Sequence, residues 1–255
     1  MSLIVEQKGA VLRVHLNRPD VRNAFDDSLI AELTSVFRDV SHDVRAVALS
    51  GEGKVFCAGG DLNWMQRTAD YSEEENLRDA EALAALFLAV DECPCPVVAR
   101  VQGAAFGGGL GLVSVSDVVI ADTGARFCFS EVKLGLVPSV ISQFAIRKIG
   151  EGAARRYFLT AEVFDANEAH RIGLAHRVVP SEQLDDETEA VLSAILSNAP
   201  NAVRSAKALI RQLRGKTVEE GVSLSTKTIA HARASEEGKE GVTAFLQKRK
   251  PSWQD

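Results

Sequence analysis

The sequence predicts an α/β fold, a layered spiral of repeated units followed by a helical region. A short apolar run, a glycine-bearing turn and a helical segment follow one another twice, at 46–65 and at 97–115, which is typical of such a spiral. From Ile141 onward the pattern is helical with one brief strand. The 255 residues, 46% of them hydrophobic, suffice to bury a full core. We expect the spiral core to span 1–195 and the helical region 196–255.

The first half of the chain alternates predicted strands and helices. The strands are short β-branched and apolar runs, and the helices carry apolar residues at helical spacing. The predicted elements are, in order, a hairpin of strands 3–6 and 11–16, a helix from Asp26 or Asp27 to about Val40, a strand at 46–49, a long helix from an acidic start at 72–75 to about Val90, a strand at 97–101, a helix at 110–115, and strands at 118–121 and 126–129. Pro94 and Pro96 stop the long helix.

The second half of the chain is predicted to be mostly helical. One helix begins at Asp165 and Glu168, which form a capping-box-like pair, and ends at Gly173. A strand at 177–179 follows, and three or four helices complete the chain. The apolar stripe of the segment 202–213 is typical of core packing or of a subunit contact.

Composition and charge exclude several classes of protein. The net charge is -6, whereas general affinity for nucleic acid requires a basic face. The longest continuous apolar stretch, Ala82 to Val90, has nine residues, far fewer than the ~20 needed to span a bilayer. The N-terminus lacks the long apolar segment of a signal peptide. We therefore expect a soluble cytoplasmic protein that binds neither nucleic acid nor membranes.

The four cysteines indicate neither a disulfide framework nor a zinc site. Cys57 lies in the first glycine turn, Cys128 in a strand-like run, and Cys93 and Cys95 flank a proline. The pair around the proline would chelate a metal only together with a second pair or with nearby histidines. No metal site is therefore expected.

Two glycine-bearing turns are the first candidates for chemistry. They are Phe56 to Leu62 and Gln102 to Gly111, and each follows a strand-like run. Glycine lets the backbone approach a ligand closely, so both turns can direct N–H groups at one oxygen, as an oxyanion hole requires. The glycine run 107–109 alone is weak evidence, because the dinucleotide pattern needs a glycine where Leu112 stands. A thioester carbonyl is the expected recipient of two converging N–H groups.

Glu131 is the candidate acid/base group. It lies among apolar residues at the predicted end of a strand, where burial would raise the pKa of a carboxyl group into the range useful for proton transfer. The alternative is a glutamate on the rim of the fold that pairs with Lys133 or Arg126. The sequence pattern leaves both interpretations open.

These segments, in this order, resemble the signatures of the enoyl-CoA hydratase/isomerase family, also called the crotonase family. The likeness covers essentially the whole chain. The matching segments are Asn17-Arg18-Pro19, Asn23-Ala24, Phe56 to Leu62, Gln102 to Gly109, Ser130 to Pro138, Leu159-Thr160-Ala161 and Glu240 to Pro251. The resemblance implies a crotonase-like spiral of ββα units with a C-terminal helical trimerisation region, in a homotrimer or homohexamer.

The resemblance also implies roles for individual residues. By position, the oxyanion-hole amides fall on Gly60 and Gly108, and the acid/base carboxylate falls on Glu131. The implied coenzyme A contacts are Arg22, Ala24, Ala58, Asp61 and Leu62, and Lys248 is expected to reach the ligand of a neighbouring subunit. No cofactor is implied, because coenzyme A is part of the acyl-CoA substrate.

One position departs from the family pattern. Typical hydratases of the family carry a second glutamate shortly after the glycine run, where this sequence has Gly111. Loss of a general acid or base commonly lowers a rate by ~10²–10⁴-fold. The water would then be held by another group, by Glu131 alone or by the substrate. Alternatively, the chain is a Δ3,Δ2-enoyl-CoA isomerase, which needs one base, or a non-catalytic CoA-binding protein.

A finer resemblance favours a hydratase. Segments 61–65, 103–108, 138–142 and 153–157 look like those of the bacterial methylglutaconyl-CoA and isohexenylglutaconyl-CoA hydratases of leucine and acyclic terpene breakdown. The substrates of these enzymes bear a second carboxylate. The resemblance implies a branched or glutaconyl-type substrate, with a receptor for that carboxylate near Ser139, Ser142, Gln143 or Arg147.

Overall fold

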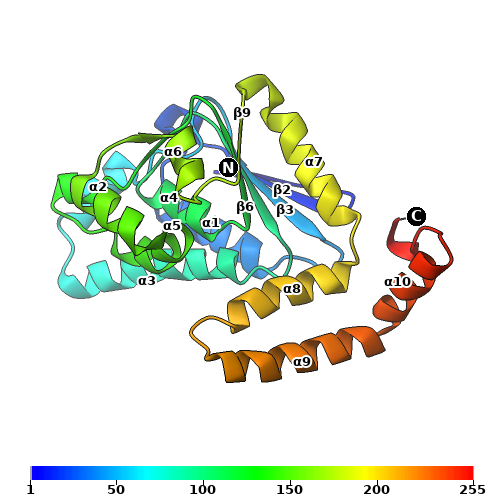
Figure 1. The fold of residues 1–255 in the computed structure, drawn as a ribbon. Coiled ribbons are helices and arrows are strands. Elements are labelled where there is room, and N and C mark those ends of the chain that lie inside the picture. Colours follow the sequence, from blue (N-terminus) through cyan, green and yellow to red (C-terminus); the bar gives the residue numbers. More distant parts are fainter. Residues whose placement is uncertain (1, 255) are drawn as a thin grey trace.

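The fold consists of a six-stranded sheet, a small three-stranded sheet and helices on both faces of the large sheet. The computed structural model describes residues 2–254 and is drawn in Figure 1. The large sheet has the order β1 (Leu3–Lys8), β2 (Val11–Leu16), β3 (Ala46–Gly51), β4 (Val97–Val101), β6 (Val118–Asp122), β9 (Arg177–Val179), and the small sheet has the order β5 (Ala104–Phe106), β7 (Arg126–Cys128), β8 (Phe164–Asp165). Strands β1 and β2 form the predicted antiparallel hairpin, and the other neighbours in the large sheet are parallel.

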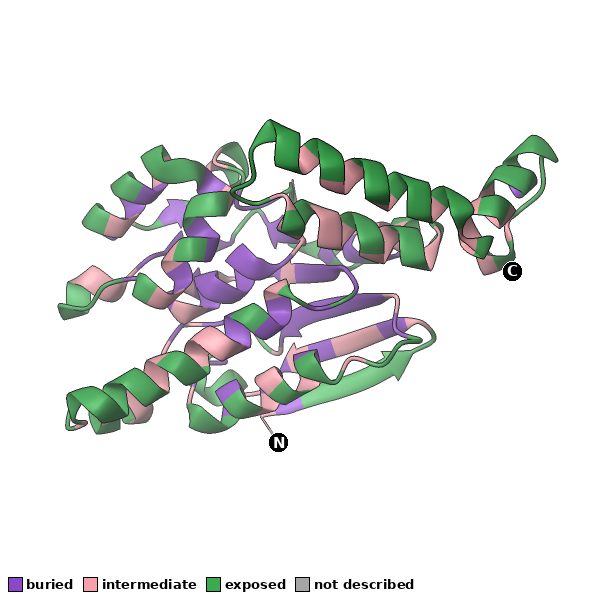
Figure 2. Cartoon of the chain, turned by 90° about the horizontal axis from the view of Figure 1, so that it is seen from below, coloured by how far each residue is buried: buried purple, intermediate pink, exposed green. Residues whose placement is uncertain are grey.

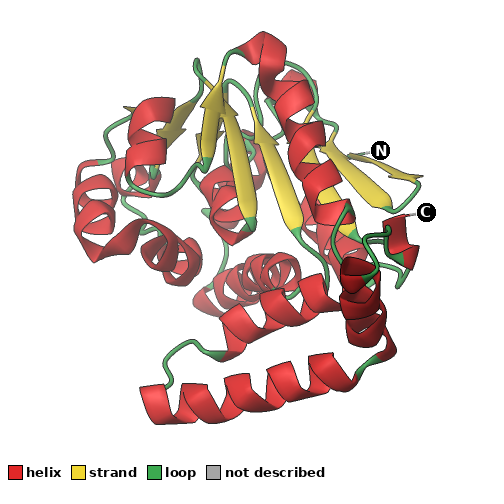
Figure 3. Ribbon diagram, turned by 45° about the vertical axis from the view of Figure 1, so that its right-hand side comes forward, coloured by secondary structure: helices red, strands yellow, loops and turns green. Residues whose placement is uncertain are grey.

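Ten α-helices lie within residues 2–254 (Figure 3). They are α1 (Asp27–Arg38), α2 (Leu62–Thr68), α3 (Glu73–Asp91), α4 (Gly108–Val115), α5 (Ser139–Thr160), α6 (Ala166–Arg171), α7 (Leu184–Leu196), α8 (Pro200–Gln212), α9 (Val218–Ala234) and α10 (Glu236–Leu246). Helix α5 is kinked at Gly150, whose φ is 76°. No helix in this part of the chain is long and apolar enough to cross a lipid bilayer.

Local capping signals placed several helices correctly. The Asp26 carboxylate caps α1 by accepting a hydrogen bond from the Leu29 N–H, and Ser72 with Glu75 forms a capping box at the start of α3. Asp165 caps α6 in the same way. The expected pairing of Asp165 with Glu168 is only half formed, because the Glu168 carboxylate accepts hydrogen bonds from Arg171 and Tyr157 instead.

The large sheet is buried on both faces. Along β3, Val47 and Leu49 point into the main core, which α1, α3, α4 and α5 cover, whereas Ala46 and Ala48 point into a second cluster beneath α7. Successive side chains of a strand face opposite sides, so a strand with helices on both sides is apolar throughout. The α/β class predicted from the apolar runs is thus confirmed.

Two predictions for the middle of the chain were incomplete. The three-residue strand β5 lies inside the second glycine turn, and it pairs in parallel with β7. Glu131 does not lie at the end of a strand: β7 ends at Cys128, and Glu131 begins a 3-10 helix, Glu131–Leu134. Short elements of this kind carry too few residues for a periodic pattern.

The C-terminal helices α8, α9 and α10 extend away from the sheet (Figures 1 and 2). Their one buried hydrophobic residue in the described chain is Ala244, and Phe245 is 82% exposed. Cations attach α8 and the turn after it to the core: Lys207 of α8 lies 2.6 Å from Asp117, and Arg214, just after α8, lies 2.7 Å from Asp91. The predicted boundary at 195/196 falls at the end of α7.

Candidate active site

The two glycine-bearing turns lie side by side in the structure. The Phe56 N–H donates to the Gln102 carbonyl at 2.9 Å, the Cys57 N–H to the Ala104 carbonyl at 3.1 Å, and the Phe106 N–H to the Cys57 carbonyl at 3.0 Å. Glycine is needed where the turns meet, because a Cβ atom on Gly109 would lie 2.6 Å from the Cys57 oxygen. The first turn thus forms a bridge along the edge of β5.

Phe25 connects Gly60 with Gly108. Its backbone pairs with the segment around Gly60, because its N–H donates to the Gly59 carbonyl at 2.7 Å and its carbonyl accepts from the Asp61 N–H at 2.8 Å. Its ring packs against the other turn, since a Cβ atom on Gly108 would lie 2.8 Å from two ring carbons. Gly60 and Gly108 are therefore both neighbours of Phe25, Gly60 through its backbone and Gly108 through its ring.

The N–H groups of Gly60 and Gly108 donate to no other residue within 2–254. Gly108 is the first residue of α4, where the N–H groups of a helix have no intrahelical partner and the helix dipole adds partial positive charge. Two such amides next to one another can bind an oxygen that develops negative charge. Gly60 and Gly108 are therefore candidates for an oxyanion hole.

Glu131 lies beside this pair of turns. Its Oε1 atom is 3.7 Å from the position that a Cβ atom on Gly107 would take, and the Gly59 Cα lies 3.9 Å from the same position. Its Oε2 atom is buried and has no hydrogen-bond partner in the described chain. Burial raises the pKa of the Glu131 carboxyl group above its usual value, against a backbone hydrogen bond that lowers it.

The structure does not support the alternative interpretation, in which Glu131 pairs with Lys133 or Arg126 on the rim of the fold. Among residues 2–254, neither Lys133 nor Arg126 forms an ion pair with Glu131, and the Arg126 guanidinium instead donates to the carbonyls of Gly124 and Ala125. A buried carboxyl oxygen without a partner is costly to a folded protein. Such a group is a candidate for proton transfer with a ligand.

Phe87 and Ile141 fill the space next to Gly111. A Cβ atom on Gly111 would lie 2.3 Å from the Phe87 Cζ atom and 2.8 Å from the Ile141 Cγ2 atom. The Phe87 ring also contacts the rings of Phe25 and Phe144, with centroids 6.5 Å and 6.2 Å apart. No side chain at position 111 fits without displacing this cluster, so the protein has one carboxylate here.

The predicted coenzyme A contacts near the N-terminus lie close to the first turn. The Ala58 N–H donates to the Arg22 carbonyl at 3.0 Å, and Arg22 has a left-handed φ of 56° and is exposed. Ala24 is buried, and the Leu62 side chain is 81% exposed. Ala58 and Arg22 are thus joined through the main chain, at the first turn.

Asp61 is occupied within the protein. Its carboxylate caps α2 by accepting from the Asn63 N–H at 2.8 Å, and it pairs with Arg18 at 3.0 Å. The Asp61 carboxylate therefore stabilises the turn. Any ligand contact at this position would come from the main chain of Asp61.

Ser139 and Lys248 lie outside the glycine turns, and Ser139 is two residues before Ile141, which packs against Gly111. Ser139 is the first residue of α5, and its carbonyl accepts from the Ser142 hydroxyl at 2.6 Å. Lys248 follows α10, whose main neighbours are α8 and α9, in the arm that extends away from the sheet (Figure 1). Within a single chain the structure does not bring Lys248 to Gly60, Gly108 or Glu131.

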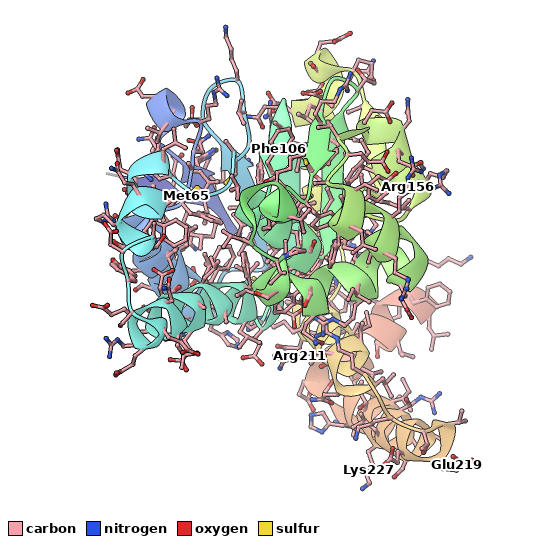
Figure 4. All side chains as sticks on the ribbon, turned by 90° about the vertical axis from the view of Figure 1, so that its left-hand side faces the viewer. Met65, Phe106, Arg156, Arg211, Glu219 and Lys227 are labelled. Carbon is pink, nitrogen blue, oxygen red and sulfur yellow. The ribbon has the colours of Figure 1, made fainter. Side chains whose placement is uncertain are left out.

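Two residues of the site were not predicted as such. The fully buried Asn23 donates to the carbonyls of Glu52 and Val55 at 2.9 and 2.8 Å, which fixes the path of the chain into the first turn. Met65, labelled on α2 in Figure 4, closes over Gly60, where a Cβ atom would lie 3.2 Å from the Met65 Cγ. Asn23 belongs to one of the segments that resemble the family, Asn23-Ala24, and could have been predicted from it. No pattern in the sequence indicated Met65.

Comparisons with known proteins agree with this geometry. A family model described as Enoyl-CoA hydratase/isomerase matches residues 6–255. The chain is similar to a putative enoyl-CoA hydratase of Thermus thermophilus, with 37% identity over 251 residues that cover 98% of this chain and 99% of the relative.

Solved structures show the same fold. One is a putative enoyl CoA hydratase/isomerase (crotonase) from Legionella pneumophila, with a TM-score of 0.92, 44% identity and coverage of 99% of this chain and 98% of that chain. Another is Pseudomonas aeruginosa AtuE, with a TM-score of 0.96, 38% identity and coverage of 100% of both chains. The expected crotonase fold is thereby confirmed.

Proposed function

Because the chain belongs to the enoyl-CoA hydratase/isomerase family, we propose that it is a lyase that adds water to a 2-enoyl-CoA thioester and catalyses the reverse dehydration. The proposal is carried by three groups that lie close together: the free amides of Gly60 and Gly108, and the Glu131 carboxyl group, whose Oε2 atom is buried and unpaired within residues 2–254. No metal or redox cofactor takes part in this chemistry.

The proposed reaction passes through an enolate. The thioester oxygen accepts hydrogen bonds from the amides of Gly60 and Gly108, and each such donor is typically worth ~3–4 kcal/mol in the transition state. The Glu131 carboxylate removes a proton from water, whose oxygen adds to C3. The electron pair of the double bond moves onto the thioester, and the protonated Glu131 then delivers its proton to C2.

The packing at Gly111 supports a second candidate. With Phe87 and Ile141 against Gly111, Glu131 is left without a second carboxylate. A Δ3,Δ2-enoyl-CoA isomerase uses one base to move a proton between C4 and C2, and the same three positions serve it. Incubation with a 3-enoyl thioester and, separately, with a branched 2-enoyl thioester distinguishes the two. A hydratase gives a 3-hydroxyacyl product that contains solvent oxygen, whereas double-bond migration alone supports the isomerase.

A non-catalytic CoA-binding protein is the remaining alternative. It would bind thioesters without converting any of them. Thioester binding with no turnover across straight-chain, branched and dicarboxylic substrates contradicts both enzymatic proposals.

For the substrate, we propose a branched or glutaconyl-type acyl-CoA. The support is the resemblance of segments 61–65, 103–108, 138–142 and 153–157 to glutaconyl-type hydratases, with the hydroxyl of Ser139 as a receptor for the second carboxylate. The test is kcat/KM for a glutaconyl-type thioester against a straight-chain thioester of equal length. Equal values for the two, or an unchanged ratio in Ser139→Ala, contradict this assignment.

For the rest of the ligand, we propose that coenzyme A contacts Arg22, Ala24, Ala58, Leu62 and the main chain at Asp61. Lys248 would contribute from a neighbouring subunit of a trimer or hexamer, since it is remote from the glycine turns of its own chain. The exposed apolar residues Phe245, Leu246 and Val242 support such an assembly. Sedimentation that shows only monomers removes Lys248 from the site.

A further inference from the structure

The connection between α3 and β4 carries two cysteines that the proposed reaction does not use. Cys93 and Cys95 flank Pro94, and their Sγ atoms lie 3.8 Å apart. Both side chains are buried, and neither forms a disulfide. The described chain contains no cluster of three potential metal ligands, so this pair lacks the additional ligands that a zinc site requires. A pair of thiols in contact is chemically a dithiol.

A cavity of about 320 Å³ opens beside one of the two thiols. It lies between the end of α3 and α8, close to Arg211, which is labelled in Figure 4 at the junction of the core and the C-terminal helices. Its lining includes Cys93 but not Cys95. A small molecule in this cavity would therefore meet Cys93 first.

The charges around the cavity are largely compensated. The Lys207 ammonium lies 2.6 Å from Asp117 and donates to the Cys95 carbonyl at 3.0 Å. Arg211 lies 2.8 Å from Glu92. Arg204, which also lines the cavity, instead donates to the backbone carbonyls of His42 and Val44. The charges of the lining therefore do not restrict the cavity to anionic or to neutral small molecules.

The two thiols have different acidities. A hydrogen bond from the Cys95 thiol lowers the pKa of Cys93 to about 7, with help from the Lys207 charge and against burial and Asp117. The same hydrogen bond and burial raise the pKa of Cys95. Burial also raises the pKa of Cys57 to about 12 and that of Cys128 above its usual value. Cys93 is thus the more acidic of two thiols in contact.

From the contact of the two sulfur atoms and the cavity at Cys93, we infer that Cys93 and Cys95 form a redox site that reduces a small hydroperoxide and closes to a disulfide. The Cys93 thiolate attacks one peroxide oxygen, an S–O bond forms, the O–O bond breaks, and the leaving oxygen takes up a proton to give water or an alcohol. Cys93 becomes a sulfenic acid. Cys95 then attacks the Cys93 sulfur, the S–S bond forms, and the S–O bond breaks with release of water.

The second step requires only a local movement. The sulfur atoms have to approach from 3.8 Å to about 2.05 Å, within one connection between two elements. The site is independent of the proposed hydration, because neither cysteine touches Gly60, Gly108 or Glu131.

The test is oxidation of the folded protein with hydrogen peroxide, followed by denaturation, alkylation of the remaining thiols and digestion with trypsin. The peptide 79–100 contains both cysteines, while Cys57 and Cys128 fall in the peptides 55–67 and 127–133 and serve as internal controls. We expect the peptide 79–100 to become two hydrogen atoms lighter. We expect this to occur at least about tenfold faster than oxidation of either control cysteine near neutral pH, since the reaction rate follows the thiolate fraction.

Two variants assign the roles of the thiols. In Cys95→Ser, a 1,3-diketone should trap a sulfenic acid on Cys93, whereas Cys93→Ser should leave Cys95 unreacted. Trapping on Cys95 instead, or oxidation of all four wild-type cysteines at one rate, overturns the inference. The wild-type comparison needs no variant to fold, and a dithiol reductant should restore both thiols.

Discussion

The Phe87 ring occupies the space into which any side chain at position 111 would project, since a Cβ atom on Gly111 would lie 2.3 Å from the Phe87 Cζ. Position 111 is where typical hydratases of the family carry their second glutamate. The absence of that carboxylate is thus built into the core and is not a simple substitution in an open pocket. Among residues 2–254, Glu131 is thus the single candidate acid/base group beside the glycine turns.

Replacement of Gly111 by alanine should therefore destabilise the protein. Overpacking of a filled core typically costs about 1–3 kcal/mol, and urea unfolding measures the loss. Phe87→Leu in the same chain should recover part of it, because the shorter side chain vacates the position of the clash. Additive losses in the double variant would show that Phe87 does not set the constraint.

Glu131→Gln should abolish most of the turnover while the fold is retained. Removal of a general acid/base group lowers kcat by ~10²–10⁴-fold, and glutamine has nearly the same shape. The matched control is Glu74→Gln, which alters an exposed carboxylate on α3 whose partner is Arg78. Near-normal kcat in Glu131→Gln, measured beside this control, refutes the role of Glu131 in either candidate reaction.

The pH dependence of stability should also report on Glu131. Burial raises the pKa of the folded carboxyl group above the usual 4.5, so the folded state holds the proton to a higher pH than the unfolded chain does. Its stabilising contribution is complete below the unfolded pKa and is lost as pH rises through the folded pKa. Urea unfolding should show that Glu131→Gln gains stability over the wild type near neutral pH but not near pH ~4. The same pKa should place the acid limb of the kcat/KM profile above 4.5, because kcat/KM reports the ionisation of the free enzyme and water activation needs the carboxylate.

Asp61→Ala should lower both stability and turnover. The change removes the N-terminal cap of α2 and the ion pair with Arg18, and loss of a cap typically costs ~0.5–2 kcal/mol. Turnover should fall because Gly60 immediately precedes Asp61. Thermal unfolding and kcat measure the two effects.

Asp165→Ala is the matched control for this variant, since Asp165 caps α6. It should lose comparable stability with unchanged kcat. A similar loss of kcat in both variants would mean that turnover follows general stability and not the geometry at Gly60.

Short-range patterns in the sequence determined much of this protein. Apolar runs with flanking turns located the strands of the large sheet, and Asp26 and Ser72 marked helix starts, because a strand or a helix cap depends on residues within a few positions of one another. The order of the glycine turns and of the segment around Glu131 carried the family resemblance. The candidate oxyanion glycines and the carboxylate were accessible in this way.

Only the tertiary structure decided how these pieces meet. It placed Glu131 in a 3-10 helix beside Gly107, filled the space at Gly111 with Phe87 from α3 and Ile141 from α5, and committed the Asp61 carboxylate to α2 and Arg18. These outcomes depend on contacts between residues that are far apart in the chain. Close packing of a core selects such contacts by shape and volume, and no local periodicity encodes them.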